Sequence, residues 1–300
     1  MSVFDIPDLS AGFERAQTPE MLYHYTGPAG LIGIATSRTL WSGRPCDLND
    51  RTEQLLIYEA LDWQIERIAY GVVTGGDSTV GPDMETLTRL RGEAVGRIPS
   101  SETVFTISLS ELDDSLDQWR AYCPRSGGVS LGFSSESLRE IARKQGFFLG
   151  RCSYGNEAEM QWLVDTVLIH ATRMVYGWPK SYIPNGAEQQ EYSERFAALV
   201  FAYLPLVAPL IKHPSFEAER EWRLVCEAPL KERLIAVASN TGLKQFLPLD
   251  LVAEGAEALG PVECVIGPNV DPEAMESAVR PILKENFGSS VVRRTESPYR

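Results

Sequence analysis

The stretch Thr-Val-Phe-Thr-Ile-Ser-Leu-Ser at residues 103–110 decides the fold class, because it gives the strongest strand signal in the chain. A polar turn at 111–114 and a short helix at 115–123 follow it. The glycines at 127–128 then form a hairpin-type turn into a second strand at 129–133. No βαβ-like unit links these two strands, and no Gly-rich nucleotide-binding motif follows any strand. The region therefore predicts an α+β fold with antiparallel-rich mixed sheets rather than a doubly wound nucleotide fold.

Strands and helices are expected in mixed order on both sides of this region. Further strands are predicted at 22–26, 40–42, 147–154, 221–226, 234–237, 244–249, 262–266 and 291–294, and further helices at 31–37, 53–71, 84–97, 136–145 and 273–286. Residues 157–212 carry mostly helical patterning, broken by a loop at 176–186. We predict a polar lead-in at 1–20 and a single α+β domain at 21–300, with a mainly helical insertion around 157–212.

Composition narrows the class of partner. The 300 residues are 44% hydrophobic and 23% charged, as in ordinary globular domains. A net charge of −13 would repel a phosphate backbone, which argues against broad, non-specific nucleic-acid binding. The N-terminus lacks the pattern of a signal peptide, and the longest apolar stretch, 196–211, is interrupted by two prolines and is expected to be too short to span a bilayer. We therefore expect a cytoplasmic protein without a membrane partner.

The cysteines and histidines do not form a metal site by spacing. The five cysteines are widely spaced, without a CxxC pair, and are expected to be reduced thiols, several of them buried. The three histidines are His24, His170 and His213, and no two lie at ligand spacing. No metal is predicted, and His170 and His213 are interpreted as structural.

His24 is the exception among the histidines. It lies between two tyrosines on the predicted strand 22–26, next to Thr26 and a Gly-Pro turn. A histidine at the end of a strand can donate a hydrogen bond to a ligand hydroxyl. The alternative is a core histidine bonded to a backbone carbonyl.

The second polar segment is Glu-Arg-Glu-Trp-Arg at residues 219–223. In a strand, Glu219, Glu221 and Arg223 would share a face, because side chains alternate. Two carboxylates side by side repel unless a cation, a ligand hydroxyl or Arg223 relieves them. Surface salt bridges are the alternative interpretation.

Two further segments carry candidate polar groups. Gln118 and Arg120 lie on the predicted helix 115–123, whose simpler role is packing through its aromatic residues with Arg120 in solvent. Asn49 and Asp50 lie in a polar loop, where such residues are more often turn formers than ligands.

Together these segments resemble the domain-of-unknown-function 2971 family of prokaryotic proteins. The resemblance runs from about residue 20 to the C-terminus, and the family label states no function. It rests on residues 22–26, 40–41, 48–50 and 53, 108–110, 117–122, 128–129, 219 with 221–223, 266–269 and 298–300.

A more distant resemblance, to ADP-ribosyltransferases, implies a function. These enzymes carry a His or Arg on a first strand, a Ser- or Tyr-bearing second strand and a catalytic Glu on a later strand. His24, then Ser108 and Ser110, then Glu221 follow the same order, and Glu219 with Glu221 is similar to an E-x-E arrangement in part of that superfamily.

The resemblance implies that NAD is the substrate. His24 would bond the ribose next to the nicotinamide, and Tyr25 or Trp41 would pack on the nicotinamide ring. Glu221 would bond the ribose 2′-hydroxyl and stabilise the oxocarbenium-like transition state, while Glu219 would orient or deprotonate the acceptor. Arg120 or Arg223 would bind the pyrophosphate. The remaining implied cofactor-binding residues are Thr26, Asn49, Ser108, Ser110 and Gln118.

These observations predict an NAD-consuming ADP-ribosyltransferase-like enzyme, a transferase or an NAD glycohydrolase, with an unknown protein, nucleic-acid or small-molecule acceptor. A toxin or phage-defence role would suit it. The alternative is a non-catalytic ligand-binding or regulatory protein on the same fold, in which Glu219, Glu221 and Arg223 form a structural ion-pair network. A nuclease or other phosphodiesterase is disfavoured by the net charge of −13 and the lack of a carboxylate-rich metal motif.

Overall fold

The computed structural model describes residues 18–45, 53–73, 84–94, 103–124, 127–176, 187–227, 233–239, 242–252, 259–269, 271–288 and 290–297. The strands are β1 (Met21–Thr26), β2 (Thr39–Gly43), β3 (Val104–Ser110), β4 (Val129–Ser134), β5 (Phe148–Arg151), β6 (Ser153–Tyr154), β7 (Ile211–Lys212), β8 (Glu221–Glu227), β9 (Ile235–Ser239), β10 (Gly242–Asp250), β11 (Glu263–Ile266) and β12 (Val291–Arg294). The α-helices are α2 (Pro28–Ser37), α3 (Glu53–Val73), α4 (Met84–Ala94), α5 (Leu116–Tyr122), α6 (Ser135–Lys144), α7 (Glu157–Tyr176), α8 (Ala187–Val207) and α9 (Pro272–Phe287), with 3-10 helices η3 (Ala208–Leu210) and η4 (Pro214–Glu219).

The sheet confirms the predicted α+β fold. Ten of the described strands form one sheet of order β12-β11-β4-β1-β3-β2-β10-β9, with β8 beside β3 and β5 beside β8. Every pairing in it is antiparallel except that of β11 with β12, as far as the described strands go.

The centre of this sheet is unevenly paired. β1 lies against β4 from Met21 to Thr26, and β3 lies against β8 along its whole length. Between β1 and β3, in contrast, a single pair of residues is in register, Tyr23 with Ser110, and β2 also meets β3 at a single pair, Gly43 with Thr106. We call this junction of β1 and β3 the seam, because it joins two well-paired blocks of sheet.

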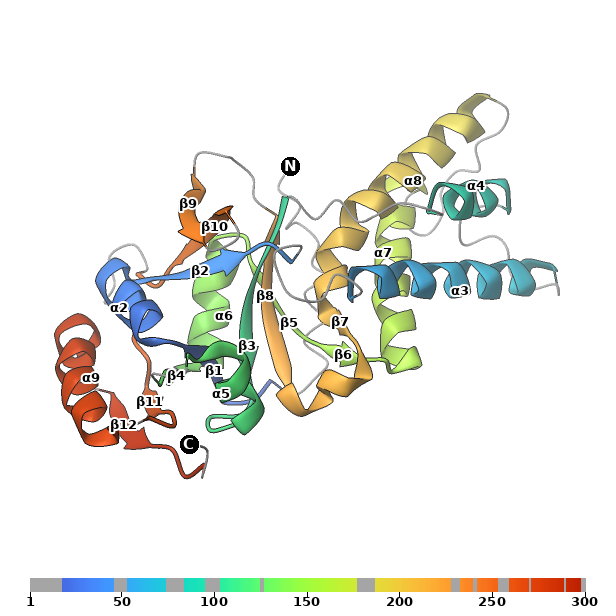
Figure 1. Ribbon diagram of the computed structural model, residues 1–300. Coiled ribbons are helices and arrows are strands. Elements are labelled where there is room, and N and C mark those ends of the chain that lie inside the picture. The colour runs from blue at the N-terminus through green and yellow to red at the C-terminus, as the bar shows by residue number, and fades with distance from the viewer. Residues whose placement is uncertain are drawn as a thin grey trace.

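Two apolar cores cover the two faces of the sheet. One contains Leu22, Leu131 and Trp222 together with residues of α2, α6 and α9. The other contains Val104 and Val225 together with residues of α3, α4, α7 and α8. Figure 1 shows these four helices as a group on the opposite side of the sheet from α2 and α9. Because side chains alternate along a strand, neighbouring residues of β8 enter different cores.

The helical group is larger than the sequence predicts. Residues 157–212 contain α7 and α8, as expected, but these helices share their core with α3 and α4 from the earlier part of the chain. Long-range packing between separate amphipathic segments produces this group, and no local pattern shows it.

Polar side chains cap the starts of α6 and α9. The Ser134 side chain accepts a hydrogen bond from the Ser137 N–H at the start of α6, and Asp271 accepts one from the Ala274 N–H at the start of α9. Gly288, at φ 85°, ends α9. Glycine adopts such a positive φ without the steric cost that other residues would meet.

One described segment, Glu188–Leu210, is long and apolar enough to cross a membrane, which corrects the expectation that this stretch is too short. Buried residues make up 56% of its apolar window. Phe196, Val200 and Leu204 are fully enclosed in the core shared with α3, α4 and α7. The segment therefore packs as the core helix of a globular domain, and cytoplasmic location stays a prediction.

The predicted strand at 147–154 is divided in two. β5 pairs with β8, whereas β6 leaves the large sheet and pairs in parallel with β7, with Tyr154 opposite Lys212. Between them the Cys152 N–H donates to the Glu221 carbonyl at 2.9 Å. This division carries Tyr154 and Lys212 to the first residue of β8.

The cysteines behave as buried thiols where they are described. Cys152, Cys226 and Cys264 are buried and Cys123 is half-buried, and none of these four forms a disulfide. The burial of three of them confirms the prediction that several cysteines are buried, and their reduced state stays a prediction. Cys46 lies outside the described residues.

Candidate functional site

A buried group of two cations and two anions lies where β7, η4 and β8 meet. The Lys212 ammonium lies 2.5 Å from a carboxylate oxygen of Glu219 and 2.5 Å from one of Glu221. The Arg223 guanidinium donates to both oxygens of Glu221, at 2.8 and 3.1 Å, and to the Pro209 carbonyl at 2.6 Å. We call these four residues, Lys212, Glu219, Glu221 and Arg223, the Lys212 cluster.

Local backbone geometry brings the two glutamates to one lysine. Glu219 ends η4 and is not part of β8, and Arg220 between them is left-handed at φ 44°. The expected single strand face at 219–223 is therefore correct for Glu221 and Arg223, but Glu219 reaches the same place through a turn. The Glu221 N–H also donates to the Tyr154 hydroxyl at 2.5 Å.

The cluster is almost sealed from solvent. The side chains of Glu221, Arg223 and Lys212 are 1%, 3% and 4% exposed, while that of Glu219 is 14% exposed. Burial alone would raise the pKa of Glu221, but Arg223 and Lys212 outweigh it and lower that pKa from 4.5 to about 2. Glu221 is therefore an ionised, fully paired carboxylate, and Glu219 is the carboxylate nearest to solvent.

Groups from β3 and α5 hold the Glu219 end of the cluster. The Ser110 hydroxyl donates to the Glu219 carbonyl at 2.8 Å, and the Gln118 amide donates to the same oxygen at 3.3 Å. Tyr122 at the end of α5 lies close enough that the charges of Glu221 and Glu219, after burial, raise its pKa. Ser110, Gln118, Glu219 and Glu221 thus lie together, and their role as site residues stays a prediction.

His24 is at the seam. Its Nδ1–H donates to the Ser108 carbonyl at 3.1 Å, which is the backbone contact considered as the alternative. Burial lowers the pKa of the ring, so His24 is neutral and its Nε2 is an acceptor. A neutral ring of this tautomer can accept a hydrogen bond from a ligand hydroxyl through Nε2.

The face of His24 differs from that of the cluster. Residues opposite each other in a ladder share a face, so Tyr23 lies on the side of Ser110 and Glu221, and His24 lies on the side of Leu131. The structure therefore brings the His24 strand beside the other two strands but leaves the His24 and Glu221 side chains on opposite faces.

The remaining candidates have separate environments. The Tyr25 hydroxyl donates to the Leu112 carbonyl at 2.8 Å, and Tyr25 packs edge-on against Trp119 at 4.6 Å. Trp41 packs on Phe246 of β10 rather than at the cluster. The other three described candidates are Thr26, which is half-buried at the end of β1, Ser108, which is half-buried on β3, and Arg120, which is exposed on α5. Asn49 lies outside the described residues, as does Asp50.

Sequence reasoning missed Lys212 and Tyr154. Both are placed by the parallel pair β6–β7, a contact between segments almost 60 residues apart in sequence. One signal was available, since Lys212 is a lone cation directly after the long apolar stretch and shortly before Glu219 and Glu221. A buried lysine of this kind needs carboxylates beside it.

The carboxylates do not create a metal site in the described part of the chain. Within those residues, no group of three or more His, Cys, Asp and Glu side chains is arranged to hold a metal ion. The Lys212 cluster instead balances its charges internally, with two cations facing two anions.

Residues 118–224 match the sequence model of a family described as "Protein of unknown function (DUF2971)". The matched segment contains all four residues of the Lys212 cluster, together with Gln118, and supports the resemblance to this family. His24, Ser108 and Ser110 precede it. No curated protein and no solved structure matches the chain. The likeness to ADP-ribosyltransferases therefore rests on the order of residues alone.

Proposed function

We propose that the chain is an NAD-consuming enzyme of the ADP-ribosyltransferase type, which cleaves the nicotinamide–ribose bond at the seam. One observation carries the proposal. The three segments that the resemblance requires lie on three consecutive strands, because β1 is beside β3 and β3 is beside β8. Ser110 is in register with both Tyr23 and Glu221, so the segments meet at one level of the sheet.

The proposed roles follow from the charges. Nicotinamide leaves as a neutral base with the electron pair of the broken bond, and positive charge develops on the ribose. Glu221 stays ionised because its pKa is about 2, and Glu219 is more exposed at 14%. Glu219 is therefore the carboxylate that approaches substrate. Glu221 and Lys212 hold its side chain in place and set the electrostatic potential around it. His24 has no role at this ribose, because its side chain lies on the opposite face of the sheet from Glu221.

The test separates binding from turnover. Purified protein is titrated with NAD by calorimetry, and nicotinamide release is measured with and without cell lysate. We expect NAD binding, release of nicotinamide and a large loss of release in Glu219→Gln, with Glu217→Gln as the exposed control on the same 3-10 helix. Absence of NAD binding would overturn the proposal.

A specific observation favours a second candidate, a non-catalytic ligand-binding or regulatory protein. Glu221 is only 1% exposed and both of its oxygens are bonded to Arg223 or Lys212. A carboxylate committed in this way serves the structure of the domain. NAD binding without nicotinamide release, unchanged in Glu219→Gln, would select this candidate over the enzyme.

The biological setting belongs to the same proposal. An NAD-consuming enzyme without a membrane partner would act in the cytoplasm, as a toxin or in defence against phage, by lowering the NAD pool or modifying an acceptor. Induced expression in a bacterial host should then slow growth and reduce cellular NAD. The Glu219→Gln variant, expressed to the same level, should not.

A further inference from the structure

Asp114, in the turn between β3 and α5, accepts hydrogen bonds from the nearby Trp119 on α5 and from the distant segment 295–296. One oxygen accepts from the indole N–H of Trp119 at 2.7 Å and from the Thr295 hydroxyl at 2.6 Å. The other accepts from the Glu296 N–H at 2.8 Å. Burial opposes the charge, but these three donors lower the pKa of Asp114, so the carboxylate is ionised at neutral pH.

The segment that reaches Asp114 comes from the edge of the sheet. Thr295 directly follows the edge strand β12, and its N–H donates to the Ile266 carbonyl of β11 at 2.8 Å. From there the chain crosses to the start of α5. Asp114 thus ties the outer edge of the sheet to a helix that lies against its centre.

On α5, Trp119 and its neighbour Gln118 extend the contacts of Asp114 to the Lys212 cluster. Trp119 is 2% exposed, and a Cβ placed on Gly267 would come within 2.7 Å of its ring, so the indole fits closely against the backbone of the sheet. Gln118, the preceding residue on α5, donates to the Glu219 carbonyl at 3.3 Å. Fixing Trp119 therefore fixes the helix that supports Glu219.

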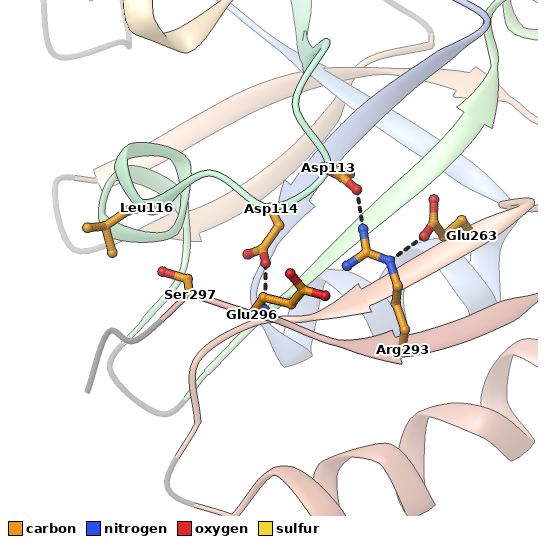
Figure 2. Close-up of a pocket in the computed structure, with 7 residues that line it drawn as sticks. All are labelled: Asp113, Asp114, Leu116, Glu263, Arg293, Glu296 and Ser297. Carbon is orange, nitrogen blue, oxygen red and sulfur yellow. Dashed lines mark hydrogen bonds and ion pairs between the residues drawn. The ribbon is translucent and has the colours of Figure 1, made fainter.

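The cleft around Asp114 gives no reason to assign its carboxylate to a ligand instead. It has a volume of about 720 Å³ and is lined by Asp113, Asp114, Leu116, Glu263, Arg293, Glu296 and Ser297 (Figure 2). Arg293 already pairs with Asp113 and with Glu263, and Figure 2 shows its guanidinium between the two. Three of the four acidic side chains in the lining are thus occupied by protein donors.

We propose that Asp114 is a positioning residue, which couples the segment 295–296 to the placement of Glu219 through Trp119 and Gln118. Its role at the active site rests on the proposed function. The coupling itself is a property of the fold and holds for either candidate function. The inference connects the C-terminal end of the described chain to the Lys212 cluster through Asp114, Trp119 and Gln118.

The test uses hydrogen–deuterium exchange on the full chain. Asp114→Asn leaves an amide nitrogen that cannot accept from the Glu296 N–H, and Thr295→Val removes the hydroxyl donor. Asp113→Asn is the matched control, because Asp113 lines the same cleft and pairs with Arg293. We expect exchange in both 116–122 and 214–221 to rise by about five- to tenfold in the first two variants. In the control, 214–221 should stay as in the wild type.

Two outcomes overturn the coupling. One is faster exchange in 116–122 while 214–221 is unchanged in both Asp114→Asn and Thr295→Val. The other is an equal change at 214–221 in the Asp113→Asn control. Thr295→Val keeps the test decisive if Asp114→Asn fails to fold.

Enzyme kinetics then separate this inference from the proposed function. If the wild type releases nicotinamide, the two variants should lower kcat at least fivefold with little change in KM, because they displace Glu219 without touching NAD. Unchanged kcat in both would refute the positioning role. If the wild type releases none, the proposed enzyme fails, and the exchange result alone decides whether the coupling exists.

Discussion

Lys212 is the residue that makes the rest of its cluster possible. Two carboxylates on one buried site repel each other, and each loses hydration on burial. The ammonium lies 2.5 Å from both, and Glu221 raises the pKa of Lys212 against the opposing effect of burial. The sequence predicts that Glu219 and Glu221 need a cation nearby, and it indicates Arg223 for this role. It does not indicate Lys212, because Lys212 is placed by the long-range β6–β7 pairing.

Removing the Glu221 charge should destabilise the domain strongly. Glu221→Gln leaves two buried cations short of a partner, and we expect the free energy of unfolding to fall by about 3–5 kcal/mol. Glu217→Gln, at an exposed position of η4, should change it by less than about 0.5 kcal/mol. Urea unfolding at neutral pH measures both. Equal stability of the two variants would contradict a structural contribution of the cluster.

The same carboxylate should make stability depend on pH in acid. Despite burial, Arg223 and Lys212 lower the pKa of Glu221 from 4.5 to about 2, so the folded state binds its proton later than the unfolded state does. The stabilisation that ionised Glu221 adds to the free energy of unfolding is complete above about pH 4.5 and is lost as the pH falls towards 2. Wild-type protein should therefore lose more stability between pH 5 and pH 2.5 than Glu221→Gln does, as measured by urea midpoints. Parallel curves would contradict the assignment.

At the scale of elements, α5 is the connection between the sheet edge, the seam and the cluster. The sequence predicts this short helix and the packing of Trp119 correctly, whereas Tyr122 is exposed. It does not predict the contact with 295–296, because that contact joins residues about 180 positions apart. Local periodicity sets where elements begin and end, whereas the contacts between distant elements depend on packing that no local pattern encodes.

The fit of α5 against the sheet can be tested at a glycine. Gly267→Ala places a Cβ 2.7 Å from the buried Trp119 ring, and we expect a loss of about 1–3 kcal/mol of stability. Gly33→Ala is the control on α2, where the same Cβ meets no atom within 4 Å. Because alanine favours a helix interior, this control should gain about 0.5–1 kcal/mol. A neutral Gly267→Ala in thermal unfolding would show that α5 is loosely placed.

At the scale of the whole molecule, the main lesson concerns the two faces of the sheet. The order of strand segments in space agrees with the expectation that His24, Ser110 and Glu221 come together. The faces of the side chains do not, because a one-residue change of register exchanges inside and outside along a strand. Register is set by the pairing of β1 with β3 and β4, which the sequence does not reveal.

The apolar segment Glu188–Leu210 gives a prediction for the whole chain. Because its buried residues contact α3, α4 and α7, the segment is already covered by protein. We expect expressed protein to remain in the supernatant after high-speed centrifugation of lysed cells. Recovery in the membrane fraction, resistant to carbonate washing, would contradict the packing of α8.

The seam has a mechanical consequence. The β1–β4 and β3–β8 ladders resist shear along many residues, whereas β3 is joined to β1, as it is to β2, at a single register position. A force applied across the sheet therefore acts mainly on the few hydrogen bonds between β1 and β3, near Tyr23 and Ser110. If β4 is pulled away from β8, β1 and β3 should separate first, with the β1–β4 and β3–β8 ladders still paired.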